Sequence, residues 1–141
     1  MREIQFRGKH TDNGEWVYGV PVIGITSGVF MVWIESEAKR GRGELSLKDV
    51  VRQAEVIPET VGQYTGLKDK NGEEIYEGDV VSNGEFERCS NDVGIVRYDT
   101  KSGCLVINNN NGRTKRLTVK VIKNNRVKVL GNFYENPELM V

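Results

Sequence analysis

Hydrophobic residues alternate with polar ones in short runs along most of the chain, and glycine, asparagine and aspartate separate the runs. This period of two, with many β-branched and aromatic residues, is typical of antiparallel strands that bury one face. The pattern predicts strands at residues 3–7, 16–23, 29–34, 54–57, 61–65, 80–81, 93–98, 104–107, 117–122 and 127–130. A helix is expected only over Ser46–Val51, where Ser46 would be the N-cap and Asp49 follows three residues later.

Several turn sequences set the connections between these strands. Asp12-Asn13-Gly14 and Asp69-Lys70-Asn71-Gly72 contain Asn-Gly, which accepts a positive φ at both central positions, and Gly78-Asp79 predicts a third turn. The middle of the chain therefore doubles back twice within a short span. Pro21 lies inside an expected strand and has no N–H to donate, so it predicts an edge or a bulge there.

The order of these elements predicts a mainly β fold (β-rich α+β) in two parts. Residues 1–62 are expected to form an antiparallel β subdomain with a variable loop at 35–44, and residues 63–141 a barrel-like subdomain. Five short strands follow residue 79, and such a series suggests a small closed or nearly closed β-barrel. The sequence GDVV, followed by VGIVRYD and another apolar strand after a turn, looks like an SH3-like barrel.

Two stretches resemble the YopX family: ETVGQYTGLKDKNGEEIYEGDVV at Glu59–Val81 and GNFYENPELM at Gly131–Met140. The opening MREIQFRG and the segment WVYGV at Trp16–Val20 are similar to the start of that family. The resemblance spans nearly the whole chain and is weakest over residues 23–50 and 83–91. It implies a phage or prophage protein of unknown role, with an N-terminal β layer, a barrel-like C-terminal part and no catalytic residues to carry over.

The amino-acid composition indicates the class of protein and its cellular compartment. Of the 141 residues, 38% are hydrophobic and 28% charged, as in ordinary globular proteins. Two cysteines and one histidine cannot build a disulfide framework or complete a four-ligand zinc site, so a reduced, cytoplasmic setting is expected. The resemblance implies that this is the cytoplasm of a bacterial host. No apolar run approaches the length of a membrane helix, and the charged start does not resemble a signal peptide, so no membrane association is expected.

Charge is unevenly distributed although the formal net charge is zero. Residues 61–92 hold 3 basic and 8 acidic side chains, whereas residues 93–141 hold 9 basic and 3 acidic ones. The opposite charges could attract each other within the fold or between subunits, and self-association is one expectation. The candidate nucleic-acid-binding residues are Arg113, Lys115, Arg116, Lys120, Lys123, Arg126 and Lys128.

These cations would lie on the outer face of a C-terminal hairpin and neutralise phosphates whatever the base sequence. The simpler interpretation is a solvated face that discourages strand-edge aggregation, because exposed aromatic residues that would stack bases are not expected there.

The sequence gives little support for a metal-binding or catalytic site. The order Asp69, Asn71, Glu73 resembles a calcium loop, but Gly72 comes too early and no glutamate occupies the closing position. His10 has no triad partners at a known spacing. We therefore expect no catalytic residue, metal or cofactor. The favoured hypothesis is a non-enzymatic accessory protein that binds a host or phage protein, and the alternative is a weak, sequence-independent nucleic-acid-binding module.

Overall fold

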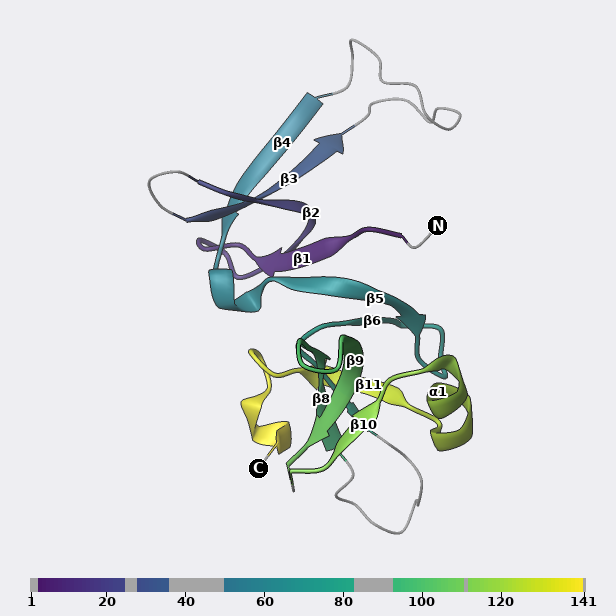
Figure 1. The fold of residues 1–141 in the computed structure, drawn as a ribbon. Coiled ribbons are helices and arrows are strands. Elements are labelled where there is room, and N and C mark those ends of the chain that lie inside the picture. Colours follow the sequence, from purple (N-terminus) through teal and green to yellow (C-terminus); the bar gives the residue numbers. More distant parts are fainter. Residues whose placement is uncertain (1–2, 25–27, 36–49, 83–92, 111, 141) are drawn as a thin grey trace. The chain divides into compact units, whose positions relative to one another are not determined.

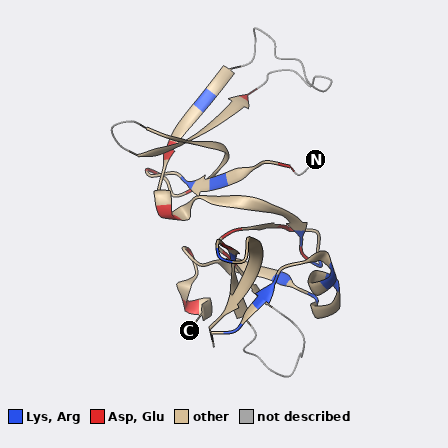
Figure 2. Ribbon diagram, viewed as in Figure 1, with Lys and Arg blue, Asp and Glu red and all other residues tan. Residues whose placement is uncertain are grey.

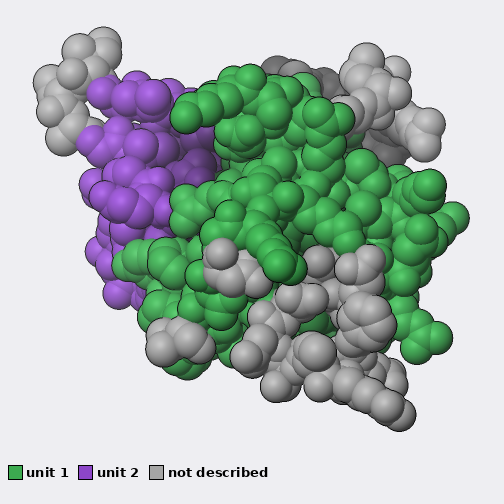
Figure 3. Space-filling view, turned by 60° about the horizontal axis from the view of Figure 1, so that its bottom comes forward, with its two compact units in different colours: residues 1–4, 62–141 green, residues 5–61 purple. Residues whose placement is uncertain are grey.

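The computed structural model describes residues 3–24, 28–35, 50–82, 93–110 and 112–140 (Figure 1). The chain divides into two compact units, coloured separately in Figure 3: unit 2, residues 5–61, and unit 1, residues 1–4 and 62–141. That residues 1–62 and 63–141 are subdomains remains a prediction. Within the described part, no helix is long and apolar enough to cross a membrane.

Unit 2 is an antiparallel sheet in the order β4-β3-β2-β1, followed by a short 3-10 helix. Its elements are β1 (Phe6–Lys9), β2 (Trp16–Ile23), β3 (Val29–Glu35), β4 (Val50–Val56) and η1 (Pro58–Thr60). Val50 and Val51 belong to β4, so the helix predicted over 46–51 is wrong at these two residues. The rest of that helix, and the predicted loop at 35–44 beyond Glu35, lie outside the described residues.

Pro21 occupies a local edge, as predicted. β2 pairs with β1 only up to Gly19, and from Val20 to Ile23 it pairs with β3. No N–H is therefore needed from Pro21 on the β1 side.

The core of unit 2 is small. Met31 and Val56 are fully buried. A Cβ added at Gly8 would lie 3.0 Å from Cγ2 of Val56 and 3.3 Å from Cε of Met31, so β1 can approach these side chains closely only with glycine there. The predicted strand at 29–34 is present, but Met31 is its only fully buried residue.

Unit 1 contains the hairpin β5 (Gly62–Lys68) and β6 (Glu74–Tyr76), and an antiparallel sheet in the order β10-β9-β8-β7-β11. The remaining elements are β7 (Asp79–Ser82), β8 (Val93–Asp99), β9 (Cys104–Asn109), β10 (Thr114–Arg116), α1 (Val119–Asn125), β11 (Lys128–Asn132) and η2 (Pro137–Met140). β10 and β11 stand at opposite ends of the sheet, so the described strands of unit 1 do not close into a barrel. The SH3-like barrel expected from the sequence is not confirmed.

The strand predicted over 117–122 is wrong, because α1 begins at Val119 and occupies the last four of these positions. Thr118 is the N-cap, and its hydroxyl accepts a hydrogen bond from the backbone N–H of Val121 at 3.1 Å. Leu117 before the cap and Ile122 four residues after it are both buried in the same core, which is the arrangement of a hydrophobic staple. The β-branched residues of this segment gave the misleading strand pattern.

The core of unit 1 draws one buried residue each from β6, β7, β8, β9 and α1, and two from the segments on either side of α1. Its buried members are Ile75, Val81, Val96, Ile107, Leu117, Ile122 and Val127. α1 contributes Ile122 to this core, and this contact fixes the helix beside the β5–β6 hairpin.

Candidate functional site

The turn between β5 and β6 is held by the buried side chain of Asp69. One carboxylate oxygen, Oδ1, accepts hydrogen bonds from the backbone N–H groups of Asn71 at 2.7 Å and Glu73 at 2.9 Å. The other, Oδ2, accepts one from the N–H of Val129 at 3.0 Å. The turn is thereby fixed to β11 as well as closed on itself.

Backbone conformation in this segment agrees with the predicted turns in part. Gly72 and Gly78 adopt positive φ angles of 83° and 89°, values that favour glycine. Asn71 does not adopt a positive φ. Among the described residues, Arg126 is the only non-glycine residue that does. The turn therefore needs one left-handed residue instead of the two that Asn-Gly suggested.

Burial alone would raise the pKa of Asp69. The hydrogen bonds from Val129, Glu73 and Asn71, together with the positive charge of Lys128, outweigh burial and lower the pKa below its ordinary value of 3.8. The carboxylate is thus kept ionised and occupied with backbone donors. Such a group is a structural residue and a poor general base.

A pocket of about 500 Å³ lies between this turn and α1. Its lining residues are Gly66, Leu67, Lys68, Asp69, Lys70, Val119, Ile122 and Lys123, and we call it the lysine-lined pocket. Ile122 is buried and Leu67 partly buried, whereas Val119 is 53% exposed. The pocket therefore combines an aliphatic surface with cationic side chains.

The three lysines of this pocket are exposed, and none forms an ion pair with a residue that the structure describes. Asp69 is the only acidic residue among the eight that line it. Serine, threonine, cysteine and histidine, which could act as nucleophile or proton carrier, are missing from this lining set. The arrangement is suited to holding an anionic group beside an apolar one.

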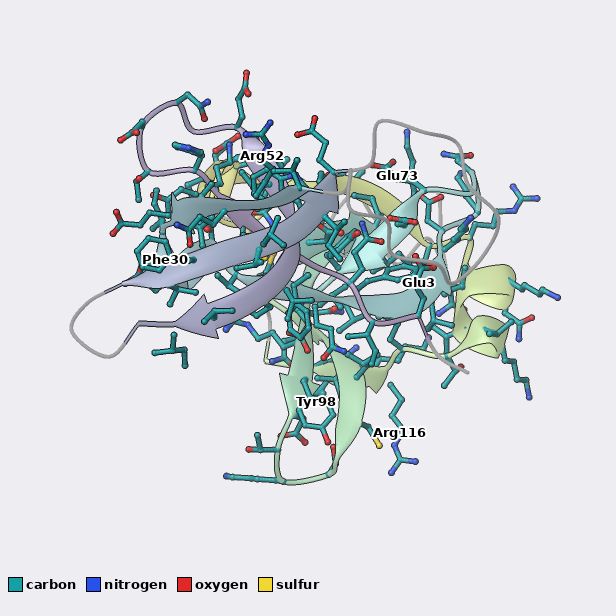
Figure 4. The ribbon with its side chains drawn as sticks, turned by 90° about the horizontal axis from the view of Figure 1, so that it is seen from above. Glu3, Phe30, Arg52, Glu73, Tyr98 and Arg116 are labelled. Carbon is teal, nitrogen blue, oxygen red and sulfur yellow. The ribbon has the colours of Figure 1, made fainter. Side chains whose placement is uncertain are left out.

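The predicted basic residues do not share one hairpin. Arg113 precedes β10, Lys115 and Arg116 lie in β10, Lys120 and Lys123 in α1, Arg126 follows the helix, and Lys128 is in β11. Figure 2 shows the cations of β10 and α1 on separate elements. Only Lys123 lines the pocket, and Arg116 projects away from the strands (Figure 4).

Arg116 belongs instead to the face of the unit 1 sheet opposite the core residues Val96 and Ile107. We call it the outer face, although Val106 within it is buried. Arg116 pairs with Val106, which pairs in turn with Arg97, and residues directly opposite in neighbouring strands share a face. The guanidinium carbon of Arg97 lies 5.9 Å from the ring centroid of Phe133, which is 41% exposed. Arg97 is not among the predicted cations, so the expectation that exposed aromatic residues are missing beside those cations stays a prediction.

Lys68, Lys70 and Val119 were not predicted as site residues. The lysines flank Asp69 in a segment expected only to bend the backbone. It does bend the backbone, but it also supplies these lysines to the pocket. The signal that could have found the site is the staple of α1, which brings Val119 and Lys123 beside the turn.

The acidic groups of the middle segment are largely turn residues. Asp79 is almost fully buried and accepts a hydrogen bond from the N–H of Tyr76 at 2.8 Å. Tyr64 and Tyr76 face each other across β5 and β6 with ring centroids 5.4 Å apart.

Among the described residues, no group of three histidine, cysteine, aspartate or glutamate side chains could hold a metal ion.

A family model described as YopX protein matches residues 5–141. The chain belongs to the YopX family. Among solved structures, it is similar to the crystal structure of protein EF1440 from Enterococcus faecalis, with 21% identity, a TM-score of 0.54 and 100% coverage of both chains. This likeness concerns the fold alone. No curated protein matches the chain.

The two stretches that carry the YopX resemblance are joined by hydrogen bonds. The carbonyl oxygen of Gly78 accepts from the side-chain amide of Asn132 at 3.2 Å and from the N–H of Phe133 at 2.9 Å. The N–H of Gly78 donates to the carbonyl oxygen of Val96 at 2.8 Å. In this YopX-family protein, the central glycine turn is thus anchored to β8 and to the C-terminal segment.

Proposed function

We propose that this YopX-family protein is a cytoplasmic accessory protein of a phage or prophage that acts by binding a protein of the host or of the phage. In this proposal it has no catalytic activity of its own. The observation that carries the proposal is the lysine-lined pocket. It offers an aliphatic surface and three uncommitted ammonium groups, and its single carboxylate is occupied by backbone donors.

A second surface supports binding in preference to catalysis. In unit 2, one face of the sheet exposes apolar side chains from three strands: Val20 (53%), Val22 (49%), Ile34 (53%) and Val51 (68%). Ile34 and Val51 are directly opposite in the β3–β4 pairing, so they share a face. Contiguous exposed apolar surfaces typically mark protein interaction sites. Self-association through this face is part of the proposal, and light scattering of the wild type and of Val51→Lys tests it.

Nucleic-acid binding is the alternative function, and it now has a specific observation in its favour. Arg97 and Arg116 share the outer face of the unit 1 sheet, and Phe133 lies beside Arg97. Cations next to exposed aromatic rings can hold single strands by phosphate neutralisation and base stacking.

Two matched variants separate these functions. The pocket variant carries Lys68→Glu, Lys70→Glu and Lys123→Glu. The sheet variant carries Arg97→Glu, Arg113→Glu and Arg116→Glu. Both change the formal charge equally, and both replace long cationic side chains of unit 1.

Affinity capture from infected or lysogenic cells is the test. We expect wild type and the sheet variant to recover the same protein, and the pocket variant to lose it. Recovery of no reproducible protein by the wild type would contradict the proposal. Salt-sensitive binding of a single-stranded oligonucleotide, lost only in the sheet variant, would establish the alternative.

A further inference from the structure

From the composition of the lysine-lined pocket, we infer that it recognises an acidic peptide segment with a large apolar side chain flanked by carboxylates. This inference rests on the proposed function and names the chemistry of the partner. The apolar side chain would lie against Leu67, Val119 and Ile122, and the carboxylates would face the surrounding lysines. A segment of this kind matches both properties of the pocket at once.

The size of the pocket suits such a segment. Its volume of about 500 Å³ falls within the roughly 300–1,000 Å³ of pockets that enclose small ligands, so it can accept one bulky side chain together with neighbouring atoms. Val119, which lines the pocket, is 53% exposed. Burying that surface and a partner side chain would supply a hydrophobic contribution to binding.

The positive charge of the pocket lining favours carboxylates on either side of the apolar side chain of the peptide. Lys68, Lys70 and Lys123 stand against one aspartate in the lining, and the negative charge of Asp69 is balanced by three backbone N–H groups and Lys128. The ammonium groups are exposed and can move on flexible stems to meet carboxylates. An acidic segment would thus be attracted and a basic one repelled.

The lining favours a peptide over a nucleic acid. Its apolar residues are aliphatic, and no tyrosine, tryptophan or phenylalanine is among the eight. Base recognition in single strands relies mainly on stacking against aromatic rings, which the outer face of the sheet provides and this pocket does not.

Selection from a random peptide library on the full chain tests the inference. We expect enriched peptides to carry an aromatic residue or leucine between aspartates or glutamates, and selection on the pocket variant to lose this enrichment. The best peptide, labelled for fluorescence anisotropy, should bind the pocket variant about tenfold or more weakly. The sheet variant should bind it within roughly twofold of wild type, because its charges lie outside the pocket.

Circular dichroism first establishes that each variant is folded. If the pocket variant is not, Lys70→Gln alone, on an exposed side chain, takes its place and should still weaken binding. Enrichment of basic or neutral peptides, no enrichment, or equal binding by the pocket and sheet variants would overturn the inference. Displacement of the peptide by a thymidine oligonucleotide from the wild type would also overturn it.

The outcomes for the two proposals are distinguishable. If cell extracts yield a protein that binds wild type and the pocket variant equally, the proposed function stands and the assignment of its partner to this pocket fails. If acidic peptides bind the pocket but no protein is captured, the chemistry of the pocket stands and the proposed function fails.

Discussion

The carboxylate of Asp69 accepts a hydrogen bond from the backbone N–H of Val129, 3.0 Å away, although 60 residues separate the two in sequence. Next to this contact, the backbone N–H of Lys70 donates a hydrogen bond to the carbonyl oxygen of Val127 at 3.0 Å. These contacts fix the β5–β6 turn to the segment that follows α1. They therefore determine the distance between the two walls of the lysine-lined pocket.

Asp69→Asn should destabilise the protein by about 2 kcal/mol or more, because hydrogen bonds to a charged group contribute roughly 1.5–3 kcal/mol each. The amide can keep one acceptor, but its NH₂ group would face donors. Urea unfolding followed by circular dichroism measures the change.

The matched control is Asp99→Asn. Asp99 also accepts hydrogen bonds from its own turn, including the hydroxyl and N–H of Ser102, but it binds no distant segment of the part of the chain that the structure describes. A loss of stability for Asp69→Asn no larger than for Asp99→Asn would contradict the role of Asp69.

Stability should fall on acidification in a way that depends on Asp69. The pKa of this group is lowered in the folded state, so its ionised form stabilises the fold above the unfolded-state pKa, near 3.8. That stabilisation is lost as the pH falls from about 4 through the lower folded-state pKa. Urea unfolding at a series of pH values should show a smaller acid loss for Asp69→Asn than for wild type, and parallel curves would contradict the prediction.

Replacing Arg126 with glycine should increase the stability of the protein, whereas replacing Asp69 should decrease it. Arg126 ends α1 in the left-handed region, with φ and ψ both 47°, where a side chain costs about 1 kcal/mol or more relative to glycine. Arg126→Gly should therefore stabilise the protein by roughly 1 kcal/mol. Arg126→Ala removes the same charge without relieving the backbone, so thermal unfolding should show no comparable gain for alanine. Equal effects of the two substitutions would assign the change to charge.

Much of the β architecture was predictable because alternation reports which strand face is buried. β2, β3, β8, β9 and β11 appear within a few residues of their predicted positions. The error over 117–122 arose because four β-branched residues suit a strand. The cap at Thr118 and the staple of Leu117 with Ile122 instead favour a helix, and they act in three dimensions.

The candidate site was less accessible from sequence. The basic residues were identified, but their grouping on one hairpin followed from the wrong strand assignment. The closure of the predicted barrel depended on pairing between terminal strands, which alternation does not specify. Likewise, the approach of Lys68 and Lys70 to α1 depends on two hydrogen bonds to residues far along the chain. The carboxylate of Asp69 accepts one from Val129 N–H, and Lys70 N–H donates the other to the carbonyl oxygen of Val127.

The central claim is that the lysine-lined pocket is where this protein binds its partner, and Val119→Asp tests it most directly. Val119 is exposed and begins α1, where an acidic residue favours the helix, so the substitution should leave folding intact. Lys120→Asp is the control, since it changes more charge one residue later but lies outside the lining. The dissociation constant of the captured protein or selected acidic peptide should rise about tenfold or more for Val119→Asp and less than about threefold for Lys120→Asp. An unchanged dissociation constant for Val119→Asp, or a larger effect of Lys120→Asp, would contradict the claim.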